Sequence, residues 1–332
     1  MGLFLDIVLL LVGFVLLIYG AKYFVLGASD LAIKFRIPEF IVGLTIVALG
    51  TSAPELAVSI TAATSGSNEM VVSNVLGSNL FNIMMVLGFV SFFKAITVDK
   101  KVLLIDYPVT IFASLLFAAF LTIGNDINRW EALVFVLCTI AYMTWTVISA
   151  IKEKKSAPKE EENDDKDKKA ENEFKVWKCA LFIICGAVAI IYGGDFVVNH
   201  AKNIGYTFGM SEALVGLTIC AVGTSLPEFT TSVTATRTGH NDMALGNVIG
   251  SNVFNIFCIL GVSGLISPIS LTEKGSEALV TNTVFDLYIF IAVTLITYVF
   301  CWTDKTLKKW EGFTLILLYF AYMAYALYRE FA

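Results

Sequence analysis

A six-residue motif, Gly-Thr-Ser-Ala-Pro-Glu at 50–55, interrupts a long apolar run and returns as Gly-Thr-Ser-Leu-Pro-Glu at 223–228. The likeness extends well beyond the motif itself. When residues 42–88 are aligned without a gap to residues 215–261, 27 of 47 positions are identical. The chain therefore contains an internal duplication, and its fold has to place two copies of one element in equivalent surroundings.

The composition is that of an integral membrane protein. Of the 332 residues, 57% are hydrophobic and only 15% are charged, against about 25% charged in soluble proteins. Polar and Gly/Pro-rich breaks divide the sequence into apolar runs of roughly 20 residues or slightly more, each long enough to cross the hydrocarbon core as a helix. The ten predicted spans lie near 3–27, 40–64, 71–93, 104–123, 131–151, 176–200, 212–236, 244–268, 281–301 and 310–329.

A charged segment divides the chain into two halves. Residues 152–175 carry both charge signs and almost no apolar side chains, which predicts a solvated linker. The domains on either side of it, 1–151 and 176–332, then hold five spans each. Because five is an odd number of crossings, the second half begins on the opposite side of the membrane from the first. The sequence thus predicts an all-α integral membrane protein with ten transmembrane helices as two inverted five-helix repeats, a plan used by secondary transporters.

The basic residues indicate the orientation in the membrane. If the N-terminus lies outside, the loops on the inner side hold 18 of the 23 Lys and Arg residues, nine of them between 152 and 178. The outer side then holds four, and Lys22 falls within the first span. The positive-inside rule therefore predicts a multi-pass protein of the cell membrane with both termini outside and the linker in the cytoplasm.

The duplicated motif places ionisable side chains inside the membrane. A carboxylate at that depth costs a few kcal/mol, so Glu55 and Glu228 are expected to face the protein interior or a water-filled cavity. Pro54 and Pro227 lack an amide hydrogen, which frees nearby backbone carbonyls from the helical hydrogen-bond pattern. Neighbouring Thr and Ser residues add hydroxyls. Carboxylate, hydroxyl and carbonyl oxygens together favour Ca2+ or Na+ over a soft transition metal.

A second polar stripe follows each glutamate. Asn74, Ser78 and Asn82 are spaced four residues apart, and Asn247, Ser251 and Asn255 repeat the pattern in the second half. Residues with this spacing share one face of a helix, so each span is expected to present an amide, a hydroxyl and an amide to the same cavity. Four helices, two from each half, are then expected to converge on one centre.

These two stretches resemble the alpha-1 and alpha-2 repeats of the calcium/cation antiporter superfamily, in particular its prokaryotic sodium/calcium exchangers. The alpha-1 motif covers 42–88 and the alpha-2 motif covers 215–261. The resemblance implies a secondary active antiporter that exchanges Na+ for Ca2+ by alternating access. Its partners would be the lipid bilayer and the two transported ions, with no cofactor, no enzymatic activity and no nucleic acid, and it would work as a monomer.

The resemblance also implies which residues hold the ions. Carried over by motif position, the implied ligands are Glu55, Glu228, Thr51, Thr224, Ser52, Ser225, Ser78, Ser251, Asn82 and Asn255, with Ala48 and Ala221 as carbonyl donors to Na+. Several relatives carry Asp at the position of Asn255, and in the potassium-dependent branch that acid is linked to K+ transport. The amide in this chain favours a potassium-independent exchanger.

Other interpretations stay open at this point. Ca2+/H+ antiport and K+-dependent Na+/Ca2+ antiport fit the same oxygen ligands, and two intramembrane carboxylates also occur in membrane-embedded hydrolases and in cation channels. Outside the motifs, Asp106 and Asp286 fall near span ends, where snorkelling to the membrane surface is expected. His200 and His240 are expected to be ordinary interfacial residues, and Glu39 is given no role in the site.

Overall fold

The computed structural model describes residues 2–66, 68–124, 126–156, 166–209, 221–270 and 277–331. In this part of the chain the fold is helical apart from four two-residue strands, and eight helices are long and apolar enough to cross a membrane. A bent pair of helices, 39–51 and 53–64, forms a ninth candidate span. The seventh predicted span, 212–236, is described only in its second part, because 210–220 lies outside the described residues.

In its described residues, the first half contains ten helical elements and two short strands before its last helix. They are α1 (Leu3–Phe35), α2 (Glu39–Val42), the π-helical turn η1 (Gly43–Val47), α3 (Ala48–Thr51), α4 (Ala53–Thr64), α5 (Asn68–Leu80), the π-helical turn η2 (Phe81–Leu87), α6 (Gly88–Phe93), β1 (Ile96–Thr97), the π-helical turn η3 (Val102–Asp106), α7 (Tyr107–Gly124) and β2 (Asp126–Ile127). Helix α8 (Arg129–Ser156) follows and completes this half.

The second half repeats much of this order. It contains α9 (Lys166–Thr207), α11 (Ala221–Gly223), α12 (Leu226–Arg237), α13 (Asn241–Phe254), the π-helical turn η5 (Asn255–Leu260), α14 (Gly261–Ile266), β3 (Ile269–Ser270), α15 (Glu277–Asp304), β4 (Thr306–Leu307) and α16 (Lys309–Phe331). The sequence predicts a linker at 152–175. Both ends of this segment are helical, because α8 continues to Ser156 and α9 begins at Lys166.

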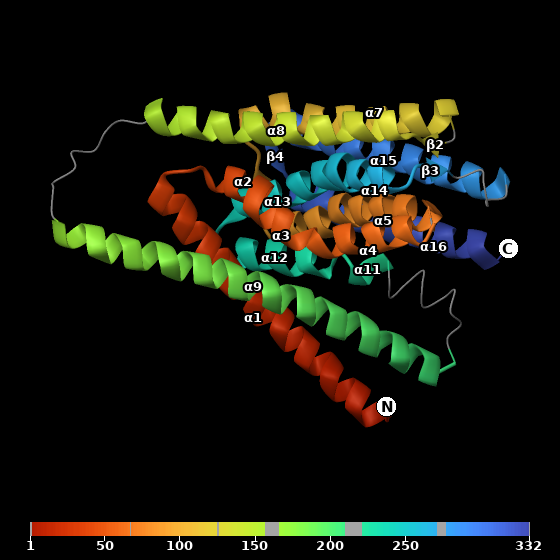
Figure 1. Cartoon of the computed structure of the whole chain (residues 1–332), viewed down its shortest axis with the longest axis horizontal. Coiled ribbons are helices and arrows are strands. Elements are labelled where there is room, and N and C mark those ends of the chain that lie inside the picture. The colour runs from red at the N-terminus through yellow and green to blue at the C-terminus, as the bar shows by residue number, and fades with distance from the viewer. Residues whose placement is uncertain are drawn as a thin grey trace.

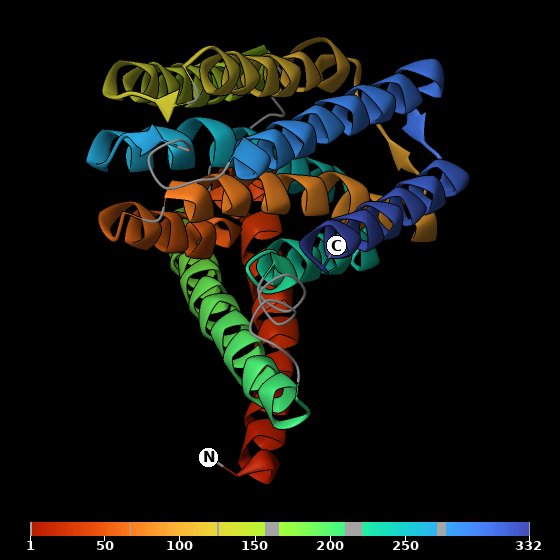
Figure 2. The same ribbon diagram turned by 90° about the vertical axis from the view of Figure 1, so that its right-hand side faces the viewer.

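The helices fall into two groups. Helices α4, α5, α12 and α13 lie at the centre with α14 and α16 near them, and α7, α8 and α15 flank them on one side (Figure 1). On the other side α1 and α9 lie obliquely against the central helices and reach away from them as a pair (Figure 2). Small residues allow this pair to pack closely, since a Cβ atom on Gly13 of α1 would lie 2.9 Å from the carbonyl oxygen of Gly193 in α9. Bulkier residues at such positions would push the two backbones apart.

The loops of the two halves are joined to each other. Strand β1 pairs antiparallel with β4, matching Ile96 with Leu307, and β2 pairs with β3, matching Ile127 with Ile269. Each short ladder therefore ties a connection of the first half to one of the second. The helical halves are held together at their edges as well as at their shared centre.

Two carboxylates near span ends behave differently from the snorkelling prediction. Asp106 is only 2% exposed and accepts a hydrogen bond of 2.8 Å from the Tyr142 hydroxyl of α8, so the snorkelling prediction is wrong for this residue. Asp286, 180 residues further on, accepts two hydrogen bonds from the guanidinium of Arg329, at 3.0 and 2.9 Å. A buried carboxylate needs such partners, and here they join α8 to η3 and α16 to α15.

The two histidines are also more than interfacial residues. His200 of α9 is buried and its Nδ1 lies 2.7 Å from Asp6 Oδ1 of α1, which also accepts a bond of 2.9 Å from Asn203. His240, just before α13, has its Nδ1 2.9 Å from Glu39 Oε1 of α2. The first contact joins α1 to α9, and the second joins the two halves.

Candidate functional site

The two copies of the duplicated motif meet at the centre of the helices, and both break there. Ser52 separates α3 from α4 and Ser225 separates α11 from α12, each with a backbone conformation outside the helical region. Pro54 and Pro227 follow within the first turn of the next helix, where a missing N–H is tolerated. The helices on either side of the first break differ in direction by 45°. The sequence therefore predicts the broken helices correctly at both prolines.

The two breaks exchange hydrogen bonds between the halves of the chain. The Ser52 hydroxyl donates to Glu228 Oε1 at 2.9 Å, and the Ser225 hydroxyl lies 3.4 Å from Glu55 Oε1. Ser78 of α5 approaches the same Glu55 oxygen at 3.4 Å and accepts a bond of 3.0 Å from Ser225. Each glutamate is thus positioned by a serine from the opposite half.

Both glutamates are fully buried, and each has one oxygen without a partner. Glu55 and Glu228 are 0% exposed, and the Oε2 atom of each has no hydrogen-bond partner in the described part of the chain. Burying an ionised carboxylate oxygen without a partner is costly, because it loses its hydration and gains nothing in return. Two such oxygens in one small region form a site suited to a cation.

The predicted polar stripes begin in α5 and α13 and continue into the π-helical turns η2 and η5. Asn82, Ser251 and Asn255 are buried, and polar side-chain atoms of all three lack a hydrogen-bond partner among the described residues. The amide nitrogen of Asn255 donates to Asn79 Oδ1 at 3.1 Å, which leaves its own oxygen available. Amide and hydroxyl oxygens of this kind are ligands that Ca2+ and Na+ accept.

The remaining predicted ligands lie at or near the breaks, and they differ in whether their oxygens already take part in hydrogen bonds. The Thr51 hydroxyl donates to Asn247 Oδ1 at 3.1 Å and lies 3.3 Å from the Ala48 carbonyl, which also accepts the Ser52 amide at 3.0 Å. Thr224 is half-buried at the second break, and Ala221 opens α11. Thr51 and Ala48 therefore already take part in protein hydrogen bonds.

A cavity leads to the two breaks from the side of α9. It has a volume of about 480 Å3, and Pro54, Thr224 and Pro227 line it together with three polar residues of α9. These residues are Asp195, Asn199 and Lys202, which are spaced along one face of the helix. The motifs gave no signal for them, because they lie outside the duplicated region and near a span end. The lining of this cavity therefore joins polar residues of α9 to the two breaks.

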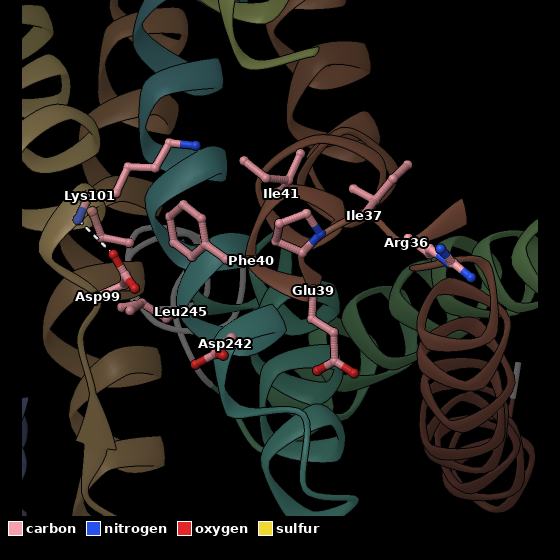
Figure 3. Close-up of a pocket in the computed structure, with 11 residues that line it drawn as sticks. Arg36, Ile37, Glu39, Phe40, Ile41, Asp99, Lys101, Asp242 and Leu245 are labelled. Atoms are coloured by element: carbon pink, nitrogen blue, oxygen red, sulfur yellow. Dashed lines mark hydrogen bonds between the residues drawn. The ribbon is translucent and has the colours of Figure 1, made fainter. Parts of the chain in front are cut away.

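A second cavity, of about 500 Å3, lies where α1 ends and α2 and α13 begin. Glu39 and Asp242 lie on one side of it and Asp99 on another, and the Lys101 backbone amide donates to Asp99 Oδ1 at 2.7 Å (Figure 3). Beside it, the Ser29 hydroxyl of α1 lies 3.3 Å from Glu39 Oε1 and 3.2 Å from His240 Nδ1. Glu39 has no predicted role in the site, and its partners Ser29 and His240 are not residues of the central site.

Comparison with known proteins adds a family match, two similar sequences and a similar structure. The family model described as sodium/calcium exchanger protein matches residues 5–148 and 178–328. The chain is 33% identical over 354 aligned residues to the sodium/calcium exchanger MaX1 of Methanosarcina acetivorans, covering 97% of this chain and 99% of that protein. It is 31% identical to the inner membrane protein YrbG of Escherichia coli, covering 89% and 88%. A structure of the sodium-calcium exchanger NCX_Mj, soaked with 2.5 mM Na+ and 0.1 mM Ca2+, superposes with a TM-score of 0.80 at 27% identity, covering 96% of this chain and 98% of that one.

Proposed function

The chain belongs to the sodium/calcium exchanger family, and from this premise we propose that it exchanges Na+ for Ca2+ across the membrane by alternating access. The observation that carries the proposal is the pair of buried glutamates whose Oε2 atoms have no partner in the described part of the chain. Two carboxylates can neutralise one Ca2+ or attract several Na+ ions. Competition between these ions for the same oxygens would couple their movements in opposite directions.

The relatives support the identity of the ions. MaX1 is named as a sodium/calcium exchanger, and NCX_Mj has been crystallised and soaked with both Na+ and Ca2+. In this chain the proposed ligands of Ca2+ are Glu55 and Glu228, assisted by oxygens of Ser78, Ser251, Asn82 and Asn255. Ser52, Ser225 and the backbone oxygens of Thr51, Thr224, Ala48 and Ala221 complete the proposed set for the two kinds of ion.

The proposed arrangement in the membrane follows from the repeat and from the charges. We infer two inverted five-helix repeats, 1–151 and 176–332, with both termini outside and 152–175 in the cytoplasm. In this orientation the cavity beside α9 opens to the outer side, and the cavity at Glu39 and Asp242 opens to the inner side. Of these two cavities, only the one beside α9 has described residues of the two breaks in its lining, so the proposed path to the site in this structure is the one from the outer side. A single chain contains both cavities, so the proposed unit of transport is the monomer.

The experiment that tests the proposal is Ca2+ uptake into vesicles that contain the purified protein. Vesicles loaded with Na+ and diluted into Na+-free medium should take up Ca2+ at least tenfold faster than vesicles loaded with choline. Adding a Na+ ionophore, which dissipates the gradient, should remove the difference.

Two alternatives give other results in the same vesicles. Equal uptake from Na+ and choline, with uptake driven by an imposed pH gradient, would overturn the proposal in favour of Ca2+/H+ antiport. A dependence on K+ together with Na+ would identify the potassium-dependent reaction. The amide of Asn255, where an acid would be expected for K+, favours the potassium-independent form.

A further inference from the structure

Asn247 of α13 makes a connected set of hydrogen bonds close to the central site without pointing at it. Its amide nitrogen donates to the Ser232 hydroxyl at 2.9 Å and lies 3.4 Å from the backbone carbonyl of Glu228. Its oxygen accepts the Thr51 hydroxyl at 3.1 Å. A backbone carbonyl can only accept, so the amide nitrogen has to face Glu228, and the orientation of the side chain is fixed. Asn247 and Ser232 are both 0% exposed.

The first half repeats this contact 173 residues earlier. The amide nitrogen of Asn74 donates to the Ser59 hydroxyl at 2.9 Å and to the backbone carbonyl of Glu55 at 3.2 Å. In both halves an asparagine of the second helix therefore holds the backbone of the glutamate and a serine one turn further along the same helix. Recurrence in two independent copies of the duplication argues against a chance contact.

The contact acts on the part of the helix that decides where the carboxylate lies. Glu55 and Glu228 lie in the first turns of α4 and α12, directly after a break. The first N–H groups of a helix have no carbonyl of a preceding turn to bond, so the backbone there is held by fewer hydrogen bonds. A second hydrogen bond to the glutamate carbonyl ties this turn to the neighbouring helix. In the second half the Thr51 hydroxyl extends the connection to the break of the other half. Calcium demands oxygens at about 2.3–2.6 Å, so a small shift of this turn would weaken its binding.

We propose that Asn247 and Asn74 are positioning residues that set the place of the Glu228 and Glu55 carboxylates by tying each glutamate's first helical turn to the adjacent helix, without contacting the ion. This inference rests on the proposed function, because the glutamates are taken as the ion ligands. The inference gives different roles to the first and the last asparagine of each polar stripe, although the sequence places both on one helix face. Asn82 and Asn255 have side-chain atoms without a hydrogen-bond partner among the described residues, whereas the amides of Asn74 and Asn247 are bonded to protein groups.

The test is a double-mutant cycle between Asn247 and Ser232, its hydrogen-bond partner on α12. Asn247→Ala should raise the KM for Ca2+ roughly tenfold with a smaller change in the maximal rate, since it removes the hydrogen bonds to Ser232, Glu228 and Thr51. Ser232→Ala should reproduce part of this rise. If both residues act through one contact, the double variant should be no worse than Asn247→Ala alone. The KM for Na+ should rise as well, because both ions use the displaced carboxylate.

Two other roles for Asn247, as an ion ligand or as a residue that only stabilises the fold, predict results different from these. If Asn247 contacts the ion, Ser232→Ala will leave the KM unchanged and the two effects will add, which would overturn the inference. If Asn247 only stabilises the fold, Asn247→Ala will lower the melting temperature of the ion-free protein and the maximal rate but leave the KM in place, which would also overturn it. Thr297→Ala removes a buried hydroxyl on α15 that donates to the Val293 carbonyl at 2.8 Å, and it serves as the control with unchanged KM.

Two further measurements keep the test decisive. If Asn247→Ala does not fold, Asn74→Ala and Ser59→Ala provide the same cycle in the first half, where Asn74 is only half-buried. Ca2+ binding to the purified wild-type protein and variants, followed by calorimetry, separates this inference from the proposed function. Wild-type protein that binds Ca2+ without exchanging Na+ would refute the proposed coupling, while the cycle in binding affinity would still decide the role of Asn247.

Discussion

Replacing Glu228 with Gln should weaken Ca2+ far more than Na+. The side chain keeps its size, and Ser52, which donates to Glu228 Oε1 at 2.9 Å, can turn its hydroxyl to accept from an amide. What is lost is one negative charge in a site that is 0% exposed. Removing one partner of a buried ion pair typically costs about 3–5 kcal/mol. For Ca2+ this corresponds to an affinity roughly 150- to 4,000-fold weaker, at about 1.4 kcal/mol for each factor of ten.

The loss for Na+ should be about half as large in free energy, because the Coulomb interaction scales with the charge of the ion. About 1.5–2.5 kcal/mol corresponds to a roughly 10- to 60-fold weaker affinity. The measurements are calorimetric titration of purified protein with each ion and Ca2+ uptake into Na+-loaded vesicles. Glu55→Gln should give a loss of similar size, since Glu55 is equally buried and its Oε2 also has no hydrogen-bond partner among the residues that the structure describes.

Asp106→Asn is the matched control. Asp106 is also a buried carboxylate of a membrane span, but it bonds to Tyr142 at the edge of the helices and not to the central serines. Its replacement should leave both affinities within about twofold of wild type, even if the protein becomes less stable. Calcium affinity that remains near wild type in both glutamate variants, or equal losses in all three, would refute the assignment of Glu55 and Glu228 to the ion site.

Three other predictions address packing, orientation and motion. Gly246→Ala should destabilise the protein by about 1–3 kcal/mol in thermal unfolding, because its Cβ would overlap the Phe40 carbonyl oxygen and lie 2.9 Å from Leu44 N, and Gly2→Ala, in open space, should not. In a cysteine-free background, Trp130→Cys should react with a membrane-impermeant maleimide on intact cells, and Lys152→Cys should react only after lysis; the reverse pattern would invert the proposed topology. A disulfide between Ser29→Cys and His240→Cys, whose wild-type side chains approach to 3.2 Å, should lower exchange at least tenfold, reversibly with reductant, and leave Ca2+ binding intact. Full-rate exchange by the cross-linked protein would show that α1 does not move relative to α13.

The sequence predicts the helix breaks and the buried glutamates at the centre of the molecule better than it predicts which side chains contact each other. Prolines 54 and 227 within apolar runs predict the two helix breaks, and the cost of a charge at membrane depth predicts that both glutamates are buried, as they are. Helical spacing also places Asn74 and Asn82 on one face. Spacing alone does not predict the hydrogen-bond partner of each amide, because that partner depends on how α4 and α12 pack against α5 and α13. Asn74 bonds to α4, whereas the amide atoms of Asn82 have no partner in the described part of the chain.

The errors in prediction share a physical reason, which is a partner distant in the sequence. Asp106 and His200 both look like residues able to reach the membrane surface, but Tyr142 and Asp6 bind them within the protein. His200 and Asp6 are 194 residues apart, and no local pattern reveals such a pair. The charged segment 152–175 stays a predicted linker, and its described ends continue the helices α8 and α9. Lys, Glu and Asp runs that lack an apolar face can still extend an existing helix at its end.

The hydrogen bonds at the centre restrict which helices can move during transport. Glu228 is held by Ser52 of the first half, and Asn247 of the second half is held by Thr51, so the four central helices cannot slide between the halves without breaking these bonds. Helices α1 and α9 have their most extensive contacts with each other and are joined at one end by Asp6 and His200 (Figure 2). Their glycine-lined contact and this buried bond make them a unit, and α9 also lines the cavity that leads to the breaks. Alternating access in inverted repeats is largely rigid-body motion, so we expect α1 and α9 to move together across a central site that stays fixed.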